Sequence, residues 1–322
     1  MGTTNDLDAL ADWIDRETRT PVGAPALAVG DRIRSRHGAA VVAVLFYGSC
    51  LRDRPDRPAE NESVLDFFVL VDRYRDVYGH WPLAVANALL PPNVHYLEVP
   101  WQGRRLRAKY AIITLAQFRR GTSGRAFRAY LWARFAQPVR LIHVRDAATR
   151  QAVVAALRDA VTTLVGRVAP LLGAEFSAAD LWCRGFRETY RAELRAEGPD
   201  RARELYQSGA ERYDRLTPLA LRASGFSPIE PSRQGRFRVA TSAVRRARGN
   251  LLWALRRWIG KPYTVLGLIK GAFTFDGAVD YIVWKIERHS GVRASLTSWQ
   301  RRHPILASPI LVWRLYRQGA FR

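Results

Sequence analysis

The stretch Val41-Val42-Ala43-Val44-Leu45-Phe46-Tyr47-Gly48-Ser49 decides the fold of the first part of the chain. Its seven apolar and aromatic residues are rich in valine, so they predict a buried strand over 41–47 that ends in a Gly-Ser turn. A polar loop rich in Asp and Pro follows over 53–63, and a second apolar run over 64–71 carries Asp66 near its start. The pattern therefore predicts two strands, with a glycine turn after the first and a carboxylate in the second.

These features suit the binding of a metal-bound triphosphate, as in the nucleotidyltransferase fold. Gly48 lets the backbone approach phosphate groups, and Ser49 offers N–H and O–H donors. Asp66 would bind Mg²⁺. On these two elements alone, a plain strand-turn-strand remains the alternative. The fold normally has a second carboxylate two positions along the strand, where Phe68 stands. Asp72 has the right parity but lies about 20 Å away along an extended strand, so the second ligand stays unidentified.

The rest of the chain adds helices and a hairpin around these strands. Two apolar runs separated by Gln102-Gly103 predict a β-hairpin. Thr114 and Gln117 have capping-box spacing for the next helix. The predicted elements are helices at 5–19, 24–37 and 82–90, hairpin strands at 94–101 and 104–113, and a helical region from 147 to about 224.

The length and pattern of the chain indicate an α+β protein with more than one domain. Its 322 residues exceed the roughly 250 to 300 at which a single core stops growing. We place a boundary near Asp146. The predicted parts are a nucleotidyltransferase-fold domain at 1–146, a helical domain at 147–230 and a basic, amphipathic, membrane-contacting segment at 231–322.

The net charge is +22, from 51 Lys and Arg against 29 Asp and Glu. Such a basic chain calls for an anionic partner, either nucleic acid or an anionic membrane surface. The charge is concentrated late in the sequence, because 18 basic residues face three acids over 231–322, a net +15. Cys50 and Cys183 show neither disulfide nor zinc-site spacing, which favours a reducing cytoplasm.

A basic amphipathic helix is predicted over 241–259. Its apolar residues fall on one face, and Arg245, Arg246, Arg256 and Arg257 fall on the opposite side. Trp258 is available for the headgroup region of a bilayer. The helix is therefore predicted to lie on an anionic membrane. The alternative is a helix packed on its own domain with solvated arginines.

Five blocks of sequence carry a longer resemblance. They are Phe46-Tyr47-Gly48-Ser49, Leu65-Asp66-Phe67-Phe68-Val69, Asn93-Val94-His95-Tyr96, Ala108-Lys109-Tyr110-Ala111-Ile112-Ile113, and Tyr130 through Arg134 to Pro138-Val139. Their content and order, over about 95 residues, resemble the mitochondrial translocator assembly and maintenance family of phosphatidate cytidylyltransferases. Three positions depart from that family: Cys50 replaces the second Gly of its phosphate loop, Leu97 stands where the family has Ser, and Gln137 replaces a Lys.

The resemblance implies CTP and phosphatidic acid as substrates, Mg²⁺ as cofactor and CDP-diacylglycerol as product. It implies that Lys109 contacts the triphosphate and stabilises developing charge, and that Arg134 binds nucleotide. Lys109 also stands out by itself, because the chain has four lysines against 47 arginines. A compact ammonium in this strand suggests a phosphate contact. The alternative for Lys109 is an exposed strand lysine. The alternative for Arg134 is that it only complements the dipole at the end of its helix.

We therefore expect a CTP:phosphatidate cytidylyltransferase. The first 20 residues lack a secretory pattern, and no apolar run approaches the roughly 20 residues of a spanning helix. The expected location is cytoplasmic, peripheral on the inner face of the membrane. Two alternatives stay open: a nucleotidyltransferase that acts on nucleic acid, favoured by the charge, and a non-catalytic membrane- or RNA-binding protein that retains the fold, favoured by the missing second carboxylate.

Overall fold

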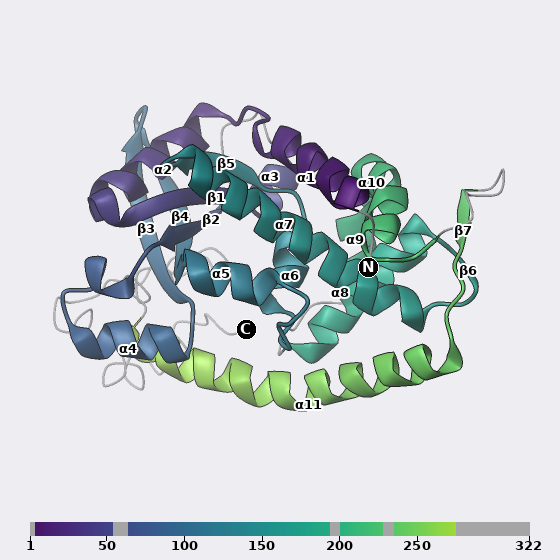
Figure 1. Ribbon diagram of the computed structural model, residues 1–322. Helices are drawn as coiled ribbons and strands as arrows, with labels where there is room; N and C mark the ends of the chain where they lie inside the picture. Colours follow the sequence, from purple (N-terminus) through teal and green to yellow (C-terminus); the bar gives the residue numbers. More distant parts are fainter. Residues whose placement is uncertain (1–3, 54–63, 194–199, 228–234, 275–322) are drawn as a thin grey trace, which may run out of the picture.

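The computed structural model (Figure 1) describes residues 4–53, 64–193, 200–227 and 235–274, and these residues form a mixed α+β fold. A five-stranded sheet has the order β3-β4-β2-β1-β5. Its strands are β1 (Val41–Tyr47), β2 (Val64–Val71), β3 (Asn93–Trp101), β4 (Arg104–Thr114) and β5 (Arg140–Val144). The first four match the predicted strands to within a residue, whereas β5 was not predicted. Most of the predicted loop at 53–63, and the C-terminal segment beyond Thr274, lie outside the described residues.

Strand register fixes the neighbours of Asp66. β2 pairs parallel with β4, which places Asp66 opposite Lys109. β2 also pairs antiparallel with β1, which places Asp66 opposite Tyr47. β3 and β5 complete the sheet with antiparallel pairings to β4 and β1. The sheet therefore brings the end of β1, Asp66 and Lys109 side by side.

The hairpin and the helix after it form as the sequence predicts. Gln102 and Gly103 both have positive φ, 47° and 75°, as a two-residue type I′ turn requires. The following helix, α5 (Leu115–Thr122), is capped because the Gln117 backbone N–H donates to Thr114 Oγ1 at 3.2 Å. Local residues thus fix the direction in which the chain leaves the sheet.

Helices cover both faces of the sheet. Along β2, Phe67 and Val69 contribute to one apolar cluster with α2 (Ala24–His37), whereas Phe68 and Leu70 contribute to a second. This second cluster includes residues of α5 and of three further helices, α1 (Thr4–Thr18), α6 (Tyr130–Phe135) and α7 (Ala147–Val168). Because side chains alternate along a strand, Asp66 belongs to the same face as Phe68. The other helices here are α3 (Ser49–Asp53) and α4 (Trp81–Leu89), with short 3-10 helices at Gly38–Ala40, Tyr74–Asp76 and Ala169–Leu171.

The predicted boundary at Asp146 coincides with the start of a long helix. The Asp146 carboxylate caps α7 (Ala147–Val168) by accepting from the Thr149 backbone N–H at 2.7 Å. One apolar cluster nevertheless continues across this point, from Phe68 of the sheet to Trp182 and Leu216 of later helices. These later helices are α8 (Ala178–Ala192), α9 (Arg201–Gln207) and α10 (Ala210–Ala223). The helical region therefore packs directly on the face of the sheet that carries Asp66.

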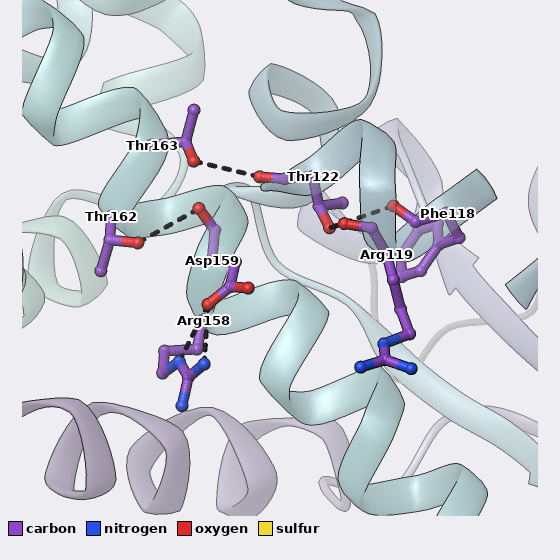
Figure 2. A network of polar contacts seen from close by, with 7 residues as sticks. All are labelled: Phe118, Arg119, Thr122, Arg158, Asp159, Thr162 and Thr163. Carbon is purple, nitrogen blue, oxygen red and sulfur yellow. Dashed lines mark hydrogen bonds and ion pairs between the residues drawn. The ribbon is translucent and has the colours of Figure 1, made fainter. Parts of the chain in front are cut away.

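Buried threonines join α5 to α7, as Figure 2 shows. The Thr163 hydroxyl donates to the Thr122 carbonyl at 3.1 Å. The Thr122 hydroxyl in turn donates to the Phe118 carbonyl at 3.0 Å. Buried polar groups cost free energy unless they are paired, so these bonds allow the two helices to pack closely.

Two features of the later chain were not predicted. A small strand pair, β6 (Glu175–Ser177) with β7 (Arg236–Arg238), links α8 to the segment before the last helix. The predicted helix at 241–259 is the first part of a longer one, α11 (Ala243–Thr274), which continues past Pro262. In Figure 1 α11 runs along one edge of the molecule and ends beside α4. No helix within the described residues is both long and apolar enough to cross a membrane.

Candidate active site

The turn after β1 brings the backbone against Asp66. Gly48 has a φ of +94°, a conformation that favours glycine. A Cβ atom at position 48 would lie 2.8 Å from Asp66 Oδ2 and 3.1 Å from Asp66 Cβ, so the carboxylate would have to move. The predicted turn then continues as the short helix α3, which starts at Ser49. Gly48 is therefore required both by its backbone angle and by the carboxylate beside it.

Asp66 and Lys109 form an ion pair across the parallel strands. Their Oδ1 and Nζ atoms are 3.8 Å apart, and the side chains are 27% and 31% exposed. The pair is therefore shielded but still reachable from solvent. A carboxylate and an ammonium held in this way can share one anionic ligand, the carboxylate through a bridging cation and the ammonium directly.

Arg134 approaches the same point from α6. Its guanidinium lies over the ring of Tyr130 at 4.3 Å and the ring of Tyr47 at 5.7 Å, measured to the ring centroids. These aromatic faces contact the cation, and the carboxylates of Glu193 and Asp66 are near enough to interact with its charge. Tyr47 directly precedes Gly48, so α6 and the end of β1 converge. The structure thus brings together Gly48, Asp66, Lys109 and Arg134, which the sequence assigned to one site.

The electrostatics of Asp66 reflect burial in a basic environment. Burial raises the pKa of the Asp66 carboxyl above its ordinary value, and the charges of Lys109, Arg134 and Arg52 offset only part of this effect. Desolvation disfavours the ionised form, whereas nearby cations favour it. A perturbed carboxyl beside several cations is typical of functional sites. The balance of charge here favours a polyanionic ligand.

Two participants were missed by sequence reasoning. Arg52 of α3 lies close enough to affect Asp66, and its Nη1 donates to Gln137 Oε1 at 3.2 Å. Gln137 thus helps to hold an arginine, at a position where the resembled family has a lysine. Glu193, at the end of α8, lines a cavity together with Lys109 and Arg134. Only the position of Arg52, three residues after Ser49, could have signalled its role in so arginine-rich a sequence.

The structure gives Cys50 a hydrogen bond that positions α3, whereas the proposed role of Ser49 depends on a ligand. The Cys50 thiol donates to the Val64 carbonyl at 3.4 Å, so it ties α3 to the start of β2. The half-buried Ser49 lies beside it as the first residue of α3. A phosphate contact of Ser49 stays a prediction.

Asp72, the other aspartate considered as a metal ligand, lies just past the far end of β2. Asp72 follows the last residue of that strand and pairs with Arg145 Nη1 at 2.5 Å. Phe68 is fully buried, with its ring near those of Phe118 and Phe135. In the part of the chain that the structure describes, no three potential metal ligands of the His, Cys, Asp or Glu type gather at one place.

A cavity of about 720 Å³ adjoins Lys109 and Arg134. One wall is α11, which contributes Arg256, Tyr263 and Gly267. Gly260 and Thr264 also belong to α11. The other lining residues come from the segment between α4 and β3, the start of β3, α6 with its preceding loop, and the end of α8: Leu90, Pro91, Pro92, Val94, Phe127, Arg128, Ala129, Tyr130, Ala192 and Glu193. This mixture of cationic and apolar side chains suits a ligand with an anionic end and an apolar body.

The helix predicted to contact a membrane faces the protein with its polar side. Arg256 is only 4% exposed, and its Nε donates to the Phe127 carbonyl at 2.9 Å. Arg257 donates to the buried Glu188 carboxylate at 2.8 Å. These two arginines therefore do not lie on a solvent-facing basic side as expected, because distant acceptors hold them inward.

The apolar side of the same helix faces outward. Trp258 is 82% exposed, and Leu251 and Leu255 are 60% and 42% exposed. Arg245 and Arg246 are exposed, as the sequence predicted. The outer surface of α11 thus presents a row of large apolar side chains with basic residues at its start.

Comparisons with known proteins leave the family open. No protein-family model matches the chain, and no curated protein matches it.

Proposed function

We propose that this protein is a CTP:phosphatidate cytidylyltransferase with a nucleotidyltransferase fold. The observation that carries the proposal is the meeting of Gly48, Asp66, Lys109 and Arg134 beside a basic and apolar cavity. These residues come from four separate blocks of the sequence that resemble one family. Their convergence supports the roles that the resemblance implies.

Each residue has a defined part in the proposed transfer. The acceptor phosphate oxygen attacks the α-phosphorus of CTP, and the bond to the β-phosphate oxygen breaks as pyrophosphate leaves. Lys109 and Arg134 hold the phosphates and stabilise charge that develops on the phosphorus. Gly48 leaves room for the phosphates against the backbone, and Ser49 donates to them.

Asp66 fits a magnesium ion that is held mainly by substrate phosphates. Magnesium in nucleotide sites often uses one or two carboxylates together with phosphate oxygens and water. Asp66 supplies one such ligand, and the nearby cations limit the negative charge that the protein itself offers. When bound, the ion would neutralise charge on the triphosphate and the leaving pyrophosphate.

The outer face of α11 supports a membrane location. Trp258 and Leu255 are exposed, while Arg245 and Arg246 provide charge for anionic headgroups. The inner face of the same helix lines the cavity, so a lipid acceptor at the membrane would be near the reacting groups. We place the protein at the inner face of the membrane as a peripheral enzyme.

The proposal is tested by incubating the purified chain with each nucleoside triphosphate, Mg²⁺ and vesicles that contain or lack phosphatidic acid. Pyrophosphate and CDP-diacylglycerol are expected only when CTP and phosphatidic acid are both present. Asp66→Asn is the inactive control. Pyrophosphate release that does not require phosphatidic acid would overturn the choice of acceptor.

The net charge of +22 favours a second candidate, transfer of a nucleotide to nucleic acid. Labelled CTP would then become attached to RNA and not to lipid. Phe68, which stands where the fold normally has a second carboxylate, favours a third, a binding protein that retains the fold. Such a protein would bind vesicles or RNA and release no pyrophosphate with any nucleotide.

A further inference from the structure

Helix α4 exposes a row of large apolar side chains. Trp81, Val85 and Leu89 are 72%, 45% and 73% exposed. They are spaced four residues apart and therefore share one face of the helix. The opposite side is anchored in the protein, where Ala84 and Asn87 are buried. An exposed apolar face of this kind usually marks an interaction site.

A polar junction fixes α4 against the end of α11. Lys270 Nζ donates to Asn87 Oδ1 at 2.7 Å, to the Leu90 carbonyl at 2.7 Å and to the Pro92 carbonyl at 2.9 Å. Val265 and Leu266, one turn earlier on α11, are 42% and 51% exposed. Figure 1 shows the two helices at the same edge of the molecule. The hydrogen bonds of Lys270 therefore tie α4 to the end of α11.

A basic pocket opens beside Leu89. Its volume is about 370 Å³, and Arg120, Arg125 and Arg128 contribute three cations to its lining. None of its lining residues is acidic. The Arg128 guanidinium lies 3.6 Å above the centroid of the Tyr263 ring, which ties the pocket to α11. Leu89, Phe127 and Leu131 supply apolar walls.

We propose that α4 is a second membrane contact and that this pocket receives the phosphate of an anionic phospholipid. The exposed tryptophan and leucine suit the interfacial region of a bilayer, and three arginines beside them match its negative charge. A phospholipid would contact both the arginines of the pocket and the apolar side chains beside it. A free phosphate ion would contact only the arginines. This contact adds to the one proposed for α11 and does not depend on nucleotide transfer.

The apolar part of the proposal is tested with the full chain and vesicles of phosphatidylcholine with phosphatidic acid. Trp81→Ser combined with Leu89→Ser should weaken vesicle binding by at least about tenfold, because it removes two large apolar side chains from the bilayer. Leu27→Ser is the control, since Leu27 is 44% exposed on a different helix, α2. The control should bind like the parent.

Insertion of α4 is measured directly by fluorescence quenching with brominated lipids. Part of the quenching of the parent should disappear in Trp81→Phe. Trp101→Phe, at the tip of the hairpin, should leave the quenching unchanged. Equal quenching of the parent and Trp81→Phe would overturn the contact even if vesicle binding itself persists.

The basic pocket is tested by Arg120→Gln combined with Arg125→Gln. Arg32→Gln combined with Arg36→Gln on α2 removes the same net charge from the other face of the sheet. Only the first pair should lose most of the preference for vesicles with phosphatidic acid over vesicles of phosphatidylcholine alone. Equal losses in both pairs would show a general charge effect and overturn the pocket.

Two further outcomes distinguish the sources of phosphate and the type of partner. Inorganic phosphate at vesicle-phosphate concentration should not displace the parent from vesicles, whereas full displacement would point to a free-phosphate site and against the lipid. Sedimentation tests self-association. A parent that dimerises without vesicles and becomes monomeric in the Trp81 and Leu89 double variant would show that a second copy covers this face.

Discussion

The two ends of strand β2 carry the same residue type in opposite settings. At one end, Asp66 lies beside Lys109, with a buried environment that raises its pKa. At the other end, Asp72 forms a pair with Arg145 in which both side chains are close to half exposed. Both aspartates have the same parity along the strand. The face of the sheet therefore does not distinguish them, and the difference lies in what surrounds each end.

The comparison shows what makes a carboxylate suitable for phosphate chemistry. Asp66 has a glycine turn against it, a lysine opposite and an aromatic-held arginine nearby. Asp72 has one arginine that solvent screens. A shielded group with several cations can respond strongly to a bound ligand, whereas a screened surface pair contributes little.

The largest expected effect is on activity at the Asp66 end. Asp66→Asn should lower cytidylyl transfer by at least about 10³-fold, because it removes the charge that holds the metal without changing the volume of the side chain. Steady-state pyrophosphate release measures the loss, and circular dichroism checks the fold. Substantial Mg²⁺-dependent turnover by the variant would refute the assignment and make the two ends of β2 alike.

A change of cation type sharpens the comparison next. Lys109→Arg should lower kcat by about 10²-fold although the charge is kept, since a planar guanidinium cannot take the place of a compact ammonium. The converse change at the other end, Arg145→Lys, is the control and should leave kcat unchanged. Identical kinetics for Lys109→Arg and the parent would show that Lys109 has no catalytic role.

The pKa of Asp66 predicts a smaller effect on stability. A carboxyl whose pKa is raised by folding stabilises the protein fully below its unfolded value of 3.8, and this contribution is lost as the pH rises through the folded pKa. Asp66→Asn should therefore be more stable than the parent at neutral pH, with the difference vanishing at acidic pH. Denaturant unfolding over a pH series measures it. A variant that is less stable than the parent at neutral pH would contradict this sign.

The smallest effect is expected at Asp72. Asp72→Asn should change the free energy of unfolding by less than about 1 kcal/mol, because the pair with Arg145 is exposed and screened by salt. Activity should stay at the level of the parent. A strong loss of turnover in this variant would mean that the far end of β2 acts on the site after all.

Local signals in the sequence were enough for much of the sheet. The apolar runs of β1 and β2, the glycine turn at Gly103 and the cap at Thr114 are each readable from a few adjacent residues. The strand β5 was missed because its five residues include an arginine and a histidine without regular alternation, and it is half-buried throughout. The pair β6 and β7 was missed because each has three residues and they are far apart in the sequence.

The site was predictable as a set of residues but not as an arrangement. Asp66 and Lys109 were identified separately, and their contact depends on the parallel pairing of β2 with β4, which periodicity does not reveal. The sequence likewise did not predict which side of α11 faces the protein. Its two faces were readable, but the inward direction depends on the Phe127 carbonyl and Glu188, which lie far away in the sequence.

The position of α1 has a consequence for biosynthesis. Its Leu10 and Ile14 side chains are buried, and its packing partners include α7 and α10. A buried ion pair between Glu17 and Arg212 at 2.6 Å also joins α1 to α10. At translation rates of 5–20 residues per second, the ribosome needs roughly 10 to 40 s to make the chain between these helices. Because α7 is made before α10, α1 has only part of its native packing during the last part of that interval.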